Sequence, residues 1–293
     1  MPLYVLDLGL ADITEKKTQR KIEYLTEQLF ECVEWLEQVT AKKFDEDRFR
    51  EAFINTTQLG QLWAEICCLN KAIPAPLDQK SMYSFFAFPL LAPHRKETVE
   101  LYRELRDETK WRVENKIAAV ATERCRLFHD GQPPWGFLKI FRYLEKYGAV
   151  CAGGIYGFSL GATWDWDKME PAKTPIEKGA PLDTRDDLIK AYAEWYIKSY
   201  IAQNMLFSPL WKAEAYLKTM KDWHIDGLLV HLNRGCEGWA FGQLEMRLGV
   251  IKGGYPVLTY EGNMSDNREF DESQTLDRLE AFLQSLGLKK LTD

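Results

Sequence analysis

Two strand-like runs separated by one helix-length segment constrain the fold of this chain more than any other feature. Residues 124–128 form the first run and lead into His129-Asp130-Gly131, while residues 149–155 form the second. The segment between them opens at Pro133-Pro134-Trp135 and is expected to be helical to about residue 146. A strand, a helix and a strand at this spacing make a βαβ unit, whose strands are parallel and whose crossover is right-handed. The sequence therefore predicts an α/β protein with a parallel sheet.

Residues 227–231 and 256–260 are two further runs of strand length. Each of the four expected strands ends in a polar loop that contains glycine: HDG, YGFSLG, HLNRGC and EGNMSD. In a parallel sheet such loops gather at one rim, where ligands bind. The predicted fold is a helical N-terminal region, residues 1–118, followed by a Rossmann- or flavodoxin-like lobe, residues 119–293, with a parallel sheet of about four to five strands.

The N-terminal region is predicted to be mainly helical. Apolar residues recur every three or four positions in residues 14–40 and again in residues 45–70, as in amphipathic helices. Residues 3–8 are instead a compact apolar run, which we interpret as a strand with no neighbouring strand in the sequence. That strand either joins the later sheet or has its natural partners outside this polypeptide.

The charge balance excludes some classes of partner. The chain has 293 residues and a formal net charge of -6, which argues against a nucleic-acid or anionic-membrane surface. No run of 18 apolar residues occurs, and residues 1–20 carry acids and lysines where a signal peptide needs an apolar core. We therefore expect a cytoplasmic protein without a membrane span, whose six scattered cysteines are free thiols.

Cys236 falls at a junction between an expected strand and an expected helix. It follows residues 227–231 and precedes residues 237–248, whose mixed polar and apolar composition suits a helix. The positive end of that helix and Arg234 both favour the thiolate, the form that attacks electrophiles or binds metal. Free cysteines also serve as small packing residues, so the spacing alone leaves both roles open. His231, which ends the same strand, is a candidate proton donor, with a hydrogen-bonded structural histidine as the alternative.

Several long segments carry a family resemblance. They are HLNRGCEGWAFGQLEMR with YPVLTYEGNMSDNREFDESQTLDRLEAFLQSL, then RLFHDGQPPWGFLKIFRYLEKYGAV, and KIEYLTEQLFECVEWLEQVTAKKFDEDRFREAF. Together they resemble the benzoyl-CoA reductase and 2-hydroxyacyl-CoA dehydratase family, most of all the B subunit of benzoyl-CoA reductase. The resemblance covers essentially the whole chain, and the N-R-x-C and M-S-D-x-R-x-F segments are fairly specific in combination.

The resemblance implies an oxygen-sensitive iron-sulfur enzyme of anaerobic metabolism. Family members pair with a homologous second subunit, receive electrons from a separate ATP-hydrolysing iron-sulfur activator, and hold a [4Fe-4S] cluster through three separated cysteines. Cys236 matches the last of these cysteines, with Asn233 and Arg234 shaping its loop and Arg234 placed to stabilise the anionic cluster or thioester. The first two are expected in an N-terminal lobe that precedes the segment PLYVLDLG in the family and that we expect to be missing from this sequence.

Three functions remain open from the sequence. The first is a subunit, or truncated subunit, of a benzoyl-CoA reductase that passes single electrons from the cluster to an acyl-CoA in aromatic degradation. The second is a subunit of an (R)-2-hydroxyacyl-CoA dehydratase, a lyase. The third is a non-catalytic pairing or scaffold subunit that holds no cluster. In each case we expect this chain not to catalyse the reaction alone.

Overall fold

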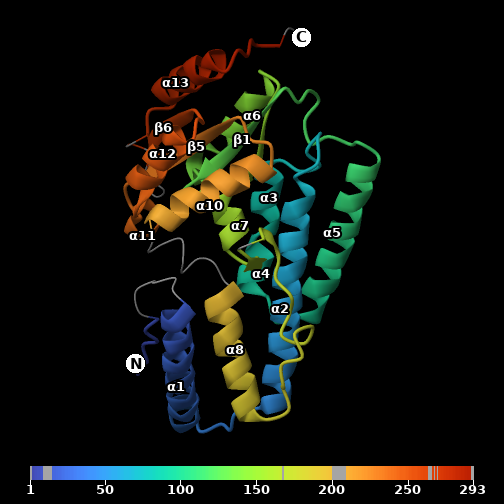
Figure 1. Ribbon diagram of the computed structural model, residues 1–293, viewed down its shortest axis with the longest axis vertical. Helices are drawn as coiled ribbons and strands as arrows, with labels where there is room; N and C mark the ends of the chain where they lie inside the picture. Colours follow the sequence, from blue (N-terminus) through green and yellow to red (C-terminus); the bar gives the residue numbers. More distant parts are fainter. Residues whose placement is uncertain are drawn as a thin grey trace.

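A parallel sheet forms the centre of the protein (Figure 1). The computed structural model describes residues 2–8, 15–166, 168–199, 209–262, 266, 268 and 270–291. Within these residues the sheet has four strands in the order β2-β1-β5-β6, and every neighbouring pair is parallel. The strands are β1 (Cys125–Asp130), β2 (Ala149–Gly154), β5 (Gly227–Asn233) and β6 (Val257–Gly262). The predicted α/β class and the four predicted strands are confirmed.

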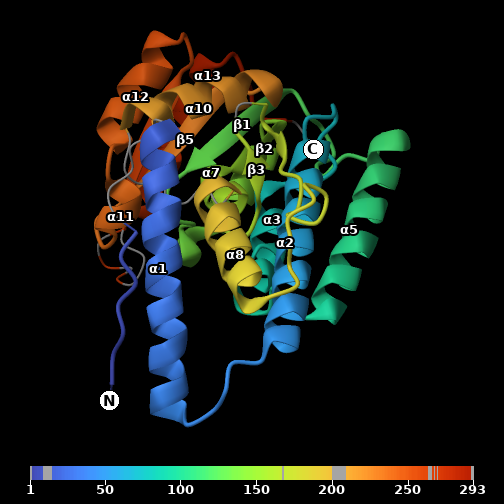
Figure 2. The same cartoon turned by 60° about the horizontal axis from the view of Figure 1, so that its bottom comes forward.

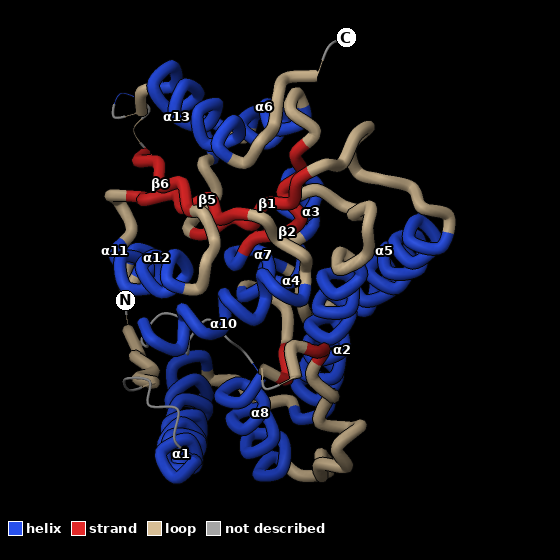
Figure 3. Tube along the Cα trace, turned by 45° about the horizontal axis from the view of Figure 1, so that its top comes forward, coloured by secondary structure: helices blue, strands red, loops and turns tan. Residues whose placement is uncertain are grey.

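Helices cover both faces of this sheet (Figure 3). One face carries α6 (Lys139–Glu145) and α13 (Glu272–Ser285), and the other carries α7 (Ile155–Ser159), α10 (Pro209–Asp222) and α12 (Gln243–Lys252). Because both faces are covered, every residue of β1 and β2 is buried. The polar groups of β1 and β2 are therefore shielded from solvent along both strands.

The N-terminal region contains α1 (Glu15–Thr40), α2 (Glu46–Leu69), α3 (Gln79–Phe85), α4 (Ala87–Leu91) and α5 (Lys96–Glu114), and α8 (Arg185–Ser199) returns to pack on α1 and α2. The long helices α1, α2, α5 and α8 extend away from the sheet (Figures 1 and 2), whereas the short α3 packs against β2. The main hydrophobic core includes Leu59 and Trp63 of α2 together with the residues of the sheet. The division of the chain at residue 118 stays a prediction. No helix in the described part of the chain is both long and apolar enough to cross a membrane.

The strand predicted at residues 3–8 is wrong, because residues 2–8 pair with no strand and lie along α1 instead. The backbone of Asp7 and the side chain of Gln28 exchange two hydrogen bonds of 2.7 and 2.6 Å. The ring of Tyr4 packs against Trp35 at a centroid distance of 5.4 Å. A strand is stable only beside another strand, and these residues have none to pair with. The segment packs against α1 instead.

One further expectation needs correction. The single helix predicted at residues 237–248 is two helices, α11 (Glu237–Ala240) and α12, because Gly242 adopts a left-handed conformation with φ 68° between them. The segment after α7 contains a small antiparallel pair, β3 (Trp164–Asp165) and β4 (Glu170–Pro171), and the side chain of Trp164 is buried in the core.

A buried charge cluster fixes two helices to the end of β1. Asp130 accepts hydrogen bonds from Tyr216 of α10 and from Nε2 of Gln243 of α12, the latter at 2.8 Å. Its Oδ1 lies 3.8 Å from Nζ of Lys212, and both of these charged side chains are buried. Buried charges persist only when they are paired and hydrogen-bonded. The cluster therefore sets where α10 and α12 sit relative to the strand ends.

We expect Asp130→Asn to lower the free energy of unfolding by about 3 kcal/mol, because it leaves the Lys212 ammonium buried without a counter-charge. The matched control is Glu194→Gln, which breaks the exposed pair between Glu194 and Lys198 at 2.7 Å and is expected to cost less than about 1 kcal/mol. Urea denaturation of both variants measures the two costs. Equal losses would contradict the inferred role of the cluster.

The turn after β1 requires a glycine at position 131. Gly131 has φ +89°, and a Cβ there would lie 2.4 Å from the carbonyl oxygen of His231. Gly179 has a similar φ of +73° but nothing within 4 Å of the position of its Cβ. We expect Gly179→Ala to cost about 1 kcal/mol for the left-handed backbone, and Gly131→Ala to cost about 1–3 kcal/mol more because of the clash. Equal shifts of the denaturation midpoint in both variants would contradict this prediction. They would show that the backbone at residue 131 and the carbonyl group of His231 can separate at no cost in stability.

Candidate functional site

The carboxyl ends of the four parallel strands meet at one rim of the sheet. β1 leads into Gly131 and Gln132, β2 into α7, and β5 into the loop that carries Cys236. β6 ends at Gly262, whose carbonyl oxygen accepts a hydrogen bond from the backbone N–H of Arg234 at 3.2 Å. Of the loop that follows β6, residues 263–265 lie outside the described residues. The rim predicted from the sequence is therefore formed by loops that are hydrogen-bonded to each other.

Cys236 lies on this rim directly before α11, and its side chain is partly exposed. The Nε2 atom of Gln132 donates a hydrogen bond to its sulfur at 3.2 Å. The expected helix dipole is weaker than the sequence suggests, because α11 has only four residues in place of the twelve predicted. The sulfur therefore depends on Gln132 more than on the helix for a donor.

The other five cysteines lie elsewhere in the fold, and no disulfide joins any of the six. Burial is the main cause that raises the pKa of each of these five thiols, to about 11 for Cys68 and about 12 for Cys125. Cys151, inside β2, is fully buried and its thiol contacts the carbonyl oxygen of Gly153 at 3.4 Å. Cys67, Cys125 and Cys151 are buried and behave as small core groups, in the way free cysteines commonly do, whereas Cys32 and Cys68 are partly exposed.

Asn233 holds the loop together from inside. It is buried, its Oδ1 accepts the backbone N–H of Gly235 at 3.0 Å, and its Nδ2 donates to Oε1 of Gln132. Asn233 thus acts on Cys236 through Gln132 and through the loop backbone. This contact was not foreseen from the sequence, because Gln132 is 101 residues from Asn233 along the chain.

His231 is buried at the end of β5. Its Nδ1 donates to the carbonyl oxygen of Gln132 at 2.7 Å, and its ring stacks on Tyr260 at 5.0 Å and 15°. Burial is the largest influence on its pKa and lowers it below the ordinary value, so the ring is neutral at pH 7. A Cβ on Gly262 would lie 2.7 Å from its Nε2, so glycine makes room for the ring. This geometry supports the structural role for His231, and the proton-donor role stays a prediction.

A second histidine lies beside His231 in the core. His129 is hydrogen-bonded through Nδ1 to the hydroxyl of Tyr83 at 3.1 Å and through Nε2 to the hydroxyl of Tyr260 at 2.7 Å. Complete burial lowers the pKa of His129 well below its ordinary value, and the nearby His231 contributes in the same direction. These residues form a neutral, hydrogen-bonded layer beneath the rim. Sequence reasoning missed this layer, although HDGQPPW places both His129 and Gln132 at a strand end.

Arg234 points along the rim to Glu261 at the end of β6, and the two form an ion pair. Their side chains are 58% and 49% exposed, so water screens this pair and it adds little stability. The guanidinium is therefore on the open side of the rim, next to the Cys236 loop. Its predicted interaction with an anionic cluster or thioester stays a prediction.

Aromatic rings flank the same loop. The rings of Tyr156, after β2, and Trp239, in α11, lie 5.0 Å apart. Burial raises the pKa of Tyr156, and the nearby Cys236 adds to that rise. Aromatic side chains thus lie beside the loop that carries Cys236.

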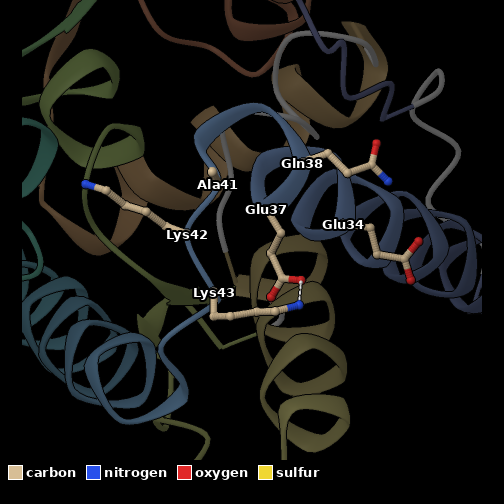
Figure 4. Close-up of a pocket in the computed structure, with 6 residues that line it drawn as sticks. All are labelled: Glu34, Glu37, Gln38, Ala41, Lys42 and Lys43. Atoms are coloured by element: carbon tan, nitrogen blue, oxygen red, sulfur yellow. Dashed lines mark hydrogen bonds and ion pairs between the residues drawn. The ribbon is translucent and has the colours of Figure 1, made fainter.

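A hollow of about 410 Å³ elsewhere on the surface lacks such chemistry (Figure 4). It is lined by the end of α1 and the loop that follows, where the Glu37 carboxylate binds Lys43 at 3.1 Å. The backbone N–H of Phe44 is the largest cause that lowers the pKa of Glu37, followed by Lys43. The carboxylate therefore closes the turn between α1 and α2, and this hollow is not a candidate active site.

The donor set of the site fits one position of a metal cluster. Among the described residues, which include all six cysteines, no group of three or more His, Cys, Asp or Glu could hold a metal ion. One sulfur that accepts an N–H hydrogen bond has the chemistry of a single cluster ligand. A complete [4Fe-4S] site needs further ligands from outside these residues.

Comparison with known proteins identifies the family. The family model for the 2-hydroxyglutaryl-CoA dehydratase D-component matches residues 1–286. The (R)-2-hydroxyglutaryl-CoA dehydratase alpha subunit of Acidaminococcus fermentans is 25% identical over 289 residues, 98% of this chain and 55% of that protein. The (R)-phenyllactyl-CoA dehydratase alpha subunit of Clostridium sporogenes is 22% identical over 293 residues, 99% of this chain and 65% of that protein.

The B subunit of the Thauera aromatica benzoyl-CoA reductase is 26% identical over 288 residues, 94% of this chain and 62% of that protein. The chain thus spans between about half and two thirds of the length of these relatives. The family match itself extends over almost the entire chain. This protein belongs to the 2-hydroxyglutaryl-CoA dehydratase D-component family.

Proposed function

We propose that this chain is a subunit of an ATP-activated enzyme that dehydrates or reduces a CoA thioester, and that Cys236 is one ligand of its [4Fe-4S] cluster. The observation that carries the proposal is the position of Cys236 at the carboxyl rim of the sheet, with an amide donor aimed at its sulfur. The names of the relatives, which are subunits of CoA-thioester dehydratases and a reductase, support the same class of reaction.

The cluster, when bound, supplies single electrons, which suits a thioester whose reacting carbon resists two-electron chemistry. The residues of this chain hold and orient one ligand. Gln132 and Asn233 fix the sulfur, and the rings of Tyr156 and Trp239 cover one side of the loop. Arg234, on the open side, has the charge to attract an anionic thioester.

The partners in this proposal are a homologous second subunit and a separate ATP-hydrolysing iron-sulfur activator. The described residues supply one suitable thiol, so the remaining cluster ligands in this proposal come from outside them. Activity of this chain therefore requires the assembled complex. A scaffold subunit without a cluster is the competing proposal, and iron content separates the two.

The substrate within the class has two candidates. The B subunit of a benzoyl-CoA reductase and the alpha subunit of a 2-hydroxyglutaryl-CoA dehydratase match this chain at 26% and 25% identity, so identity alone does not choose. The benzoyl-CoA reductase type is our first proposal on the motifs of the sequence. The family description and several dehydratase alpha subunits among the relatives favour an (R)-2-hydroxyacyl-CoA dehydratase as the second.

The cluster assignment is tested by Cys236→Ser in the complex assembled anaerobically with its second subunit. The change keeps the size of the side chain but replaces a soft thiolate with a hydroxyl that an iron-sulfur cluster accepts poorly. We expect the iron and sulfide content to fall by most of one cluster per chain, with the thermal midpoint of the fold little changed. The matched control is Cys32→Ser on α1, which is expected to leave the iron content intact. Full iron in Cys236→Ser would show that Cys236 is not a ligand.

The substrate is tested by supplying the activated complex with benzoyl-CoA and, separately, with a set of (R)-2-hydroxyacyl-CoA thioesters. A reductase yields a dienoyl-CoA from the aromatic ring and consumes reducing equivalents in proportion to product. A dehydratase yields a 2-enoyl-CoA and water without net consumption of electrons. Product analysis by mass spectrometry identifies which reaction occurs, and turnover of neither class by an iron-loaded complex would refute the proposed activity.

A further inference from the structure

Helix α12 is apolar on two opposite faces. Its inner face, which includes Met246 and Val250, is buried where α12 contacts α10 and β6. Its outer face carries Leu244, Leu248 and Ile251, which are 62%, 48% and 44% exposed. A helix that covers a sheet at the protein surface is ordinarily polar on its outer side, whereas a helix that is apolar all round is ordinarily buried all round. The outer face of α12 therefore has the composition of a covered surface.

The three exposed residues, which we call the α12 stripe, lie in one line along the helix. They follow each other at intervals of four and three residues, so each side chain is one turn from the next on the same side. Single exposed apolar side chains are common on protein surfaces, but a line with this spacing is the seam through which two helices pack. Helices α11 and α12 lie together at one edge of the molecule (Figures 1 and 3). The α12 stripe is thus open to a second molecule.

Two charges of opposite sign accompany the α12 stripe. Glu245 and Lys252 are both exposed and are seven residues apart, which places them on the same flank of the helix. The distance between their positions along the helix axis is about 10 Å. Within the described part of the chain neither side chain takes part in an ion pair. The surface therefore suits another helix that has an apolar seam and carries one acid and one base beside it.

Helix α12 of a second copy has this chemistry when it runs in the opposite direction. A two-fold axis perpendicular to both helices places each flank beside the same flank of the other copy and reverses its direction. With the axis midway between positions 245 and 252, Glu245 of each copy lies opposite Lys252 of the other. The Leu248 side chains of both copies then lie next to the axis. One symmetry operation thus covers the α12 stripe and pairs each flanking charge with its opposite.

We propose that the α12 stripe, with Glu245 and Lys252, is the contact between two copies of this chain, whose α12 helices pack antiparallel around a two-fold axis. Helix α12 has ten residues, so contact through it alone is at the small end of specific interfaces, below about 1,200 Å² in total. The association is therefore weak and depends on concentration. The loop that carries Cys236 leads through α11 into α12, so the second copy lies beside the carboxyl rim of the sheet.

The first test places a charge in the seam. Leu248→Glu puts two carboxylates next to the axis, where they lose water without gaining a partner. Sedimentation velocity of the purified full chain over a range of concentrations measures the dimer dissociation constant, which we expect to rise at least about tenfold in this variant. The matched control is Leu101→Glu on α5, because Leu101 is also an exposed leucine on a helix, at 40%. The control is expected to associate as the unchanged chain does, and circular dichroism confirms that both variants are folded.

The second test exchanges the charges and leaves the α12 stripe intact. Glu245→Lys alone sets two lysines opposite each other on each side of the axis, and Lys252→Glu alone sets two glutamates there. We expect each single change to raise the dissociation constant about fivefold at low salt, and added salt to reduce this effect by screening. The double variant Glu245→Lys with Lys252→Glu restores opposite charges and is expected to return to within about threefold of the unchanged chain.

Three results would overturn the proposal. The chain could remain a monomer at every concentration reached, or Leu101→Glu could weaken the association as much as Leu248→Glu does. In the third, the chain alone is a monomer and binds the proposed second subunit through a contact that Leu248→Glu abolishes, which would assign the α12 stripe to that partner. A double charge variant as weak as the single variants would reject the antiparallel pairing.

Discussion

The pairing of β1 with a parallel strand on each side is the constraint on which the rest of the structure depends. β1 aligns with β2 along one edge and with β5 along the other, through the pairs Leu127 with Cys151 and Leu127 with Gly227. A side chain at this centre is covered from both faces, so the polar end of β1 must be satisfied within the protein. At this end of β1, Asp130 accepts hydrogen bonds from α10 and α12, and Gln132 donates a hydrogen bond to Cys236. These bonds connect the end of β1 to the other elements at the rim.

The rim divides into an inner and an outer layer with different physical properties. The inner layer contains His129, His231 and Tyr260, which are buried, neutral and hydrogen-bonded or stacked. The outer layer contains Cys236 and the ion pair of Arg234 with Glu261, which meet solvent. Gln132 joins the layers, since its carbonyl oxygen faces His231 and its amide faces the sulfur. A buried, hydrogen-bonded layer beneath an exposed one can hold the exposed side chains in a fixed orientation.

The sequence by itself determined the class of fold and the place of Cys236. Helix periodicity and short apolar runs depend on neighbouring residues, so α1, α2 and the four strands were predictable, as was a cysteine at the end of β5. It did not predict that the run at residues 3–8 would lie on α1, since a strand forms only where another strand is available. Nor did it predict the break at Gly242, which depends on a left-handed backbone between α11 and α12.

Only the tertiary structure decided which side chains act on the cysteine. Gln132 and Cys236 are 104 residues apart, and the pairing of β1 with β5 brings them into contact. The same pairing turned His231 inward, toward the carbonyl oxygen of Gln132, and left Arg234 to bind Glu261 across the rim. Local sequence patterns carry no information about such contacts. Neighbouring strands of a parallel sheet are separated in the sequence by at least one helix, and the register of their pairing decides which residues meet.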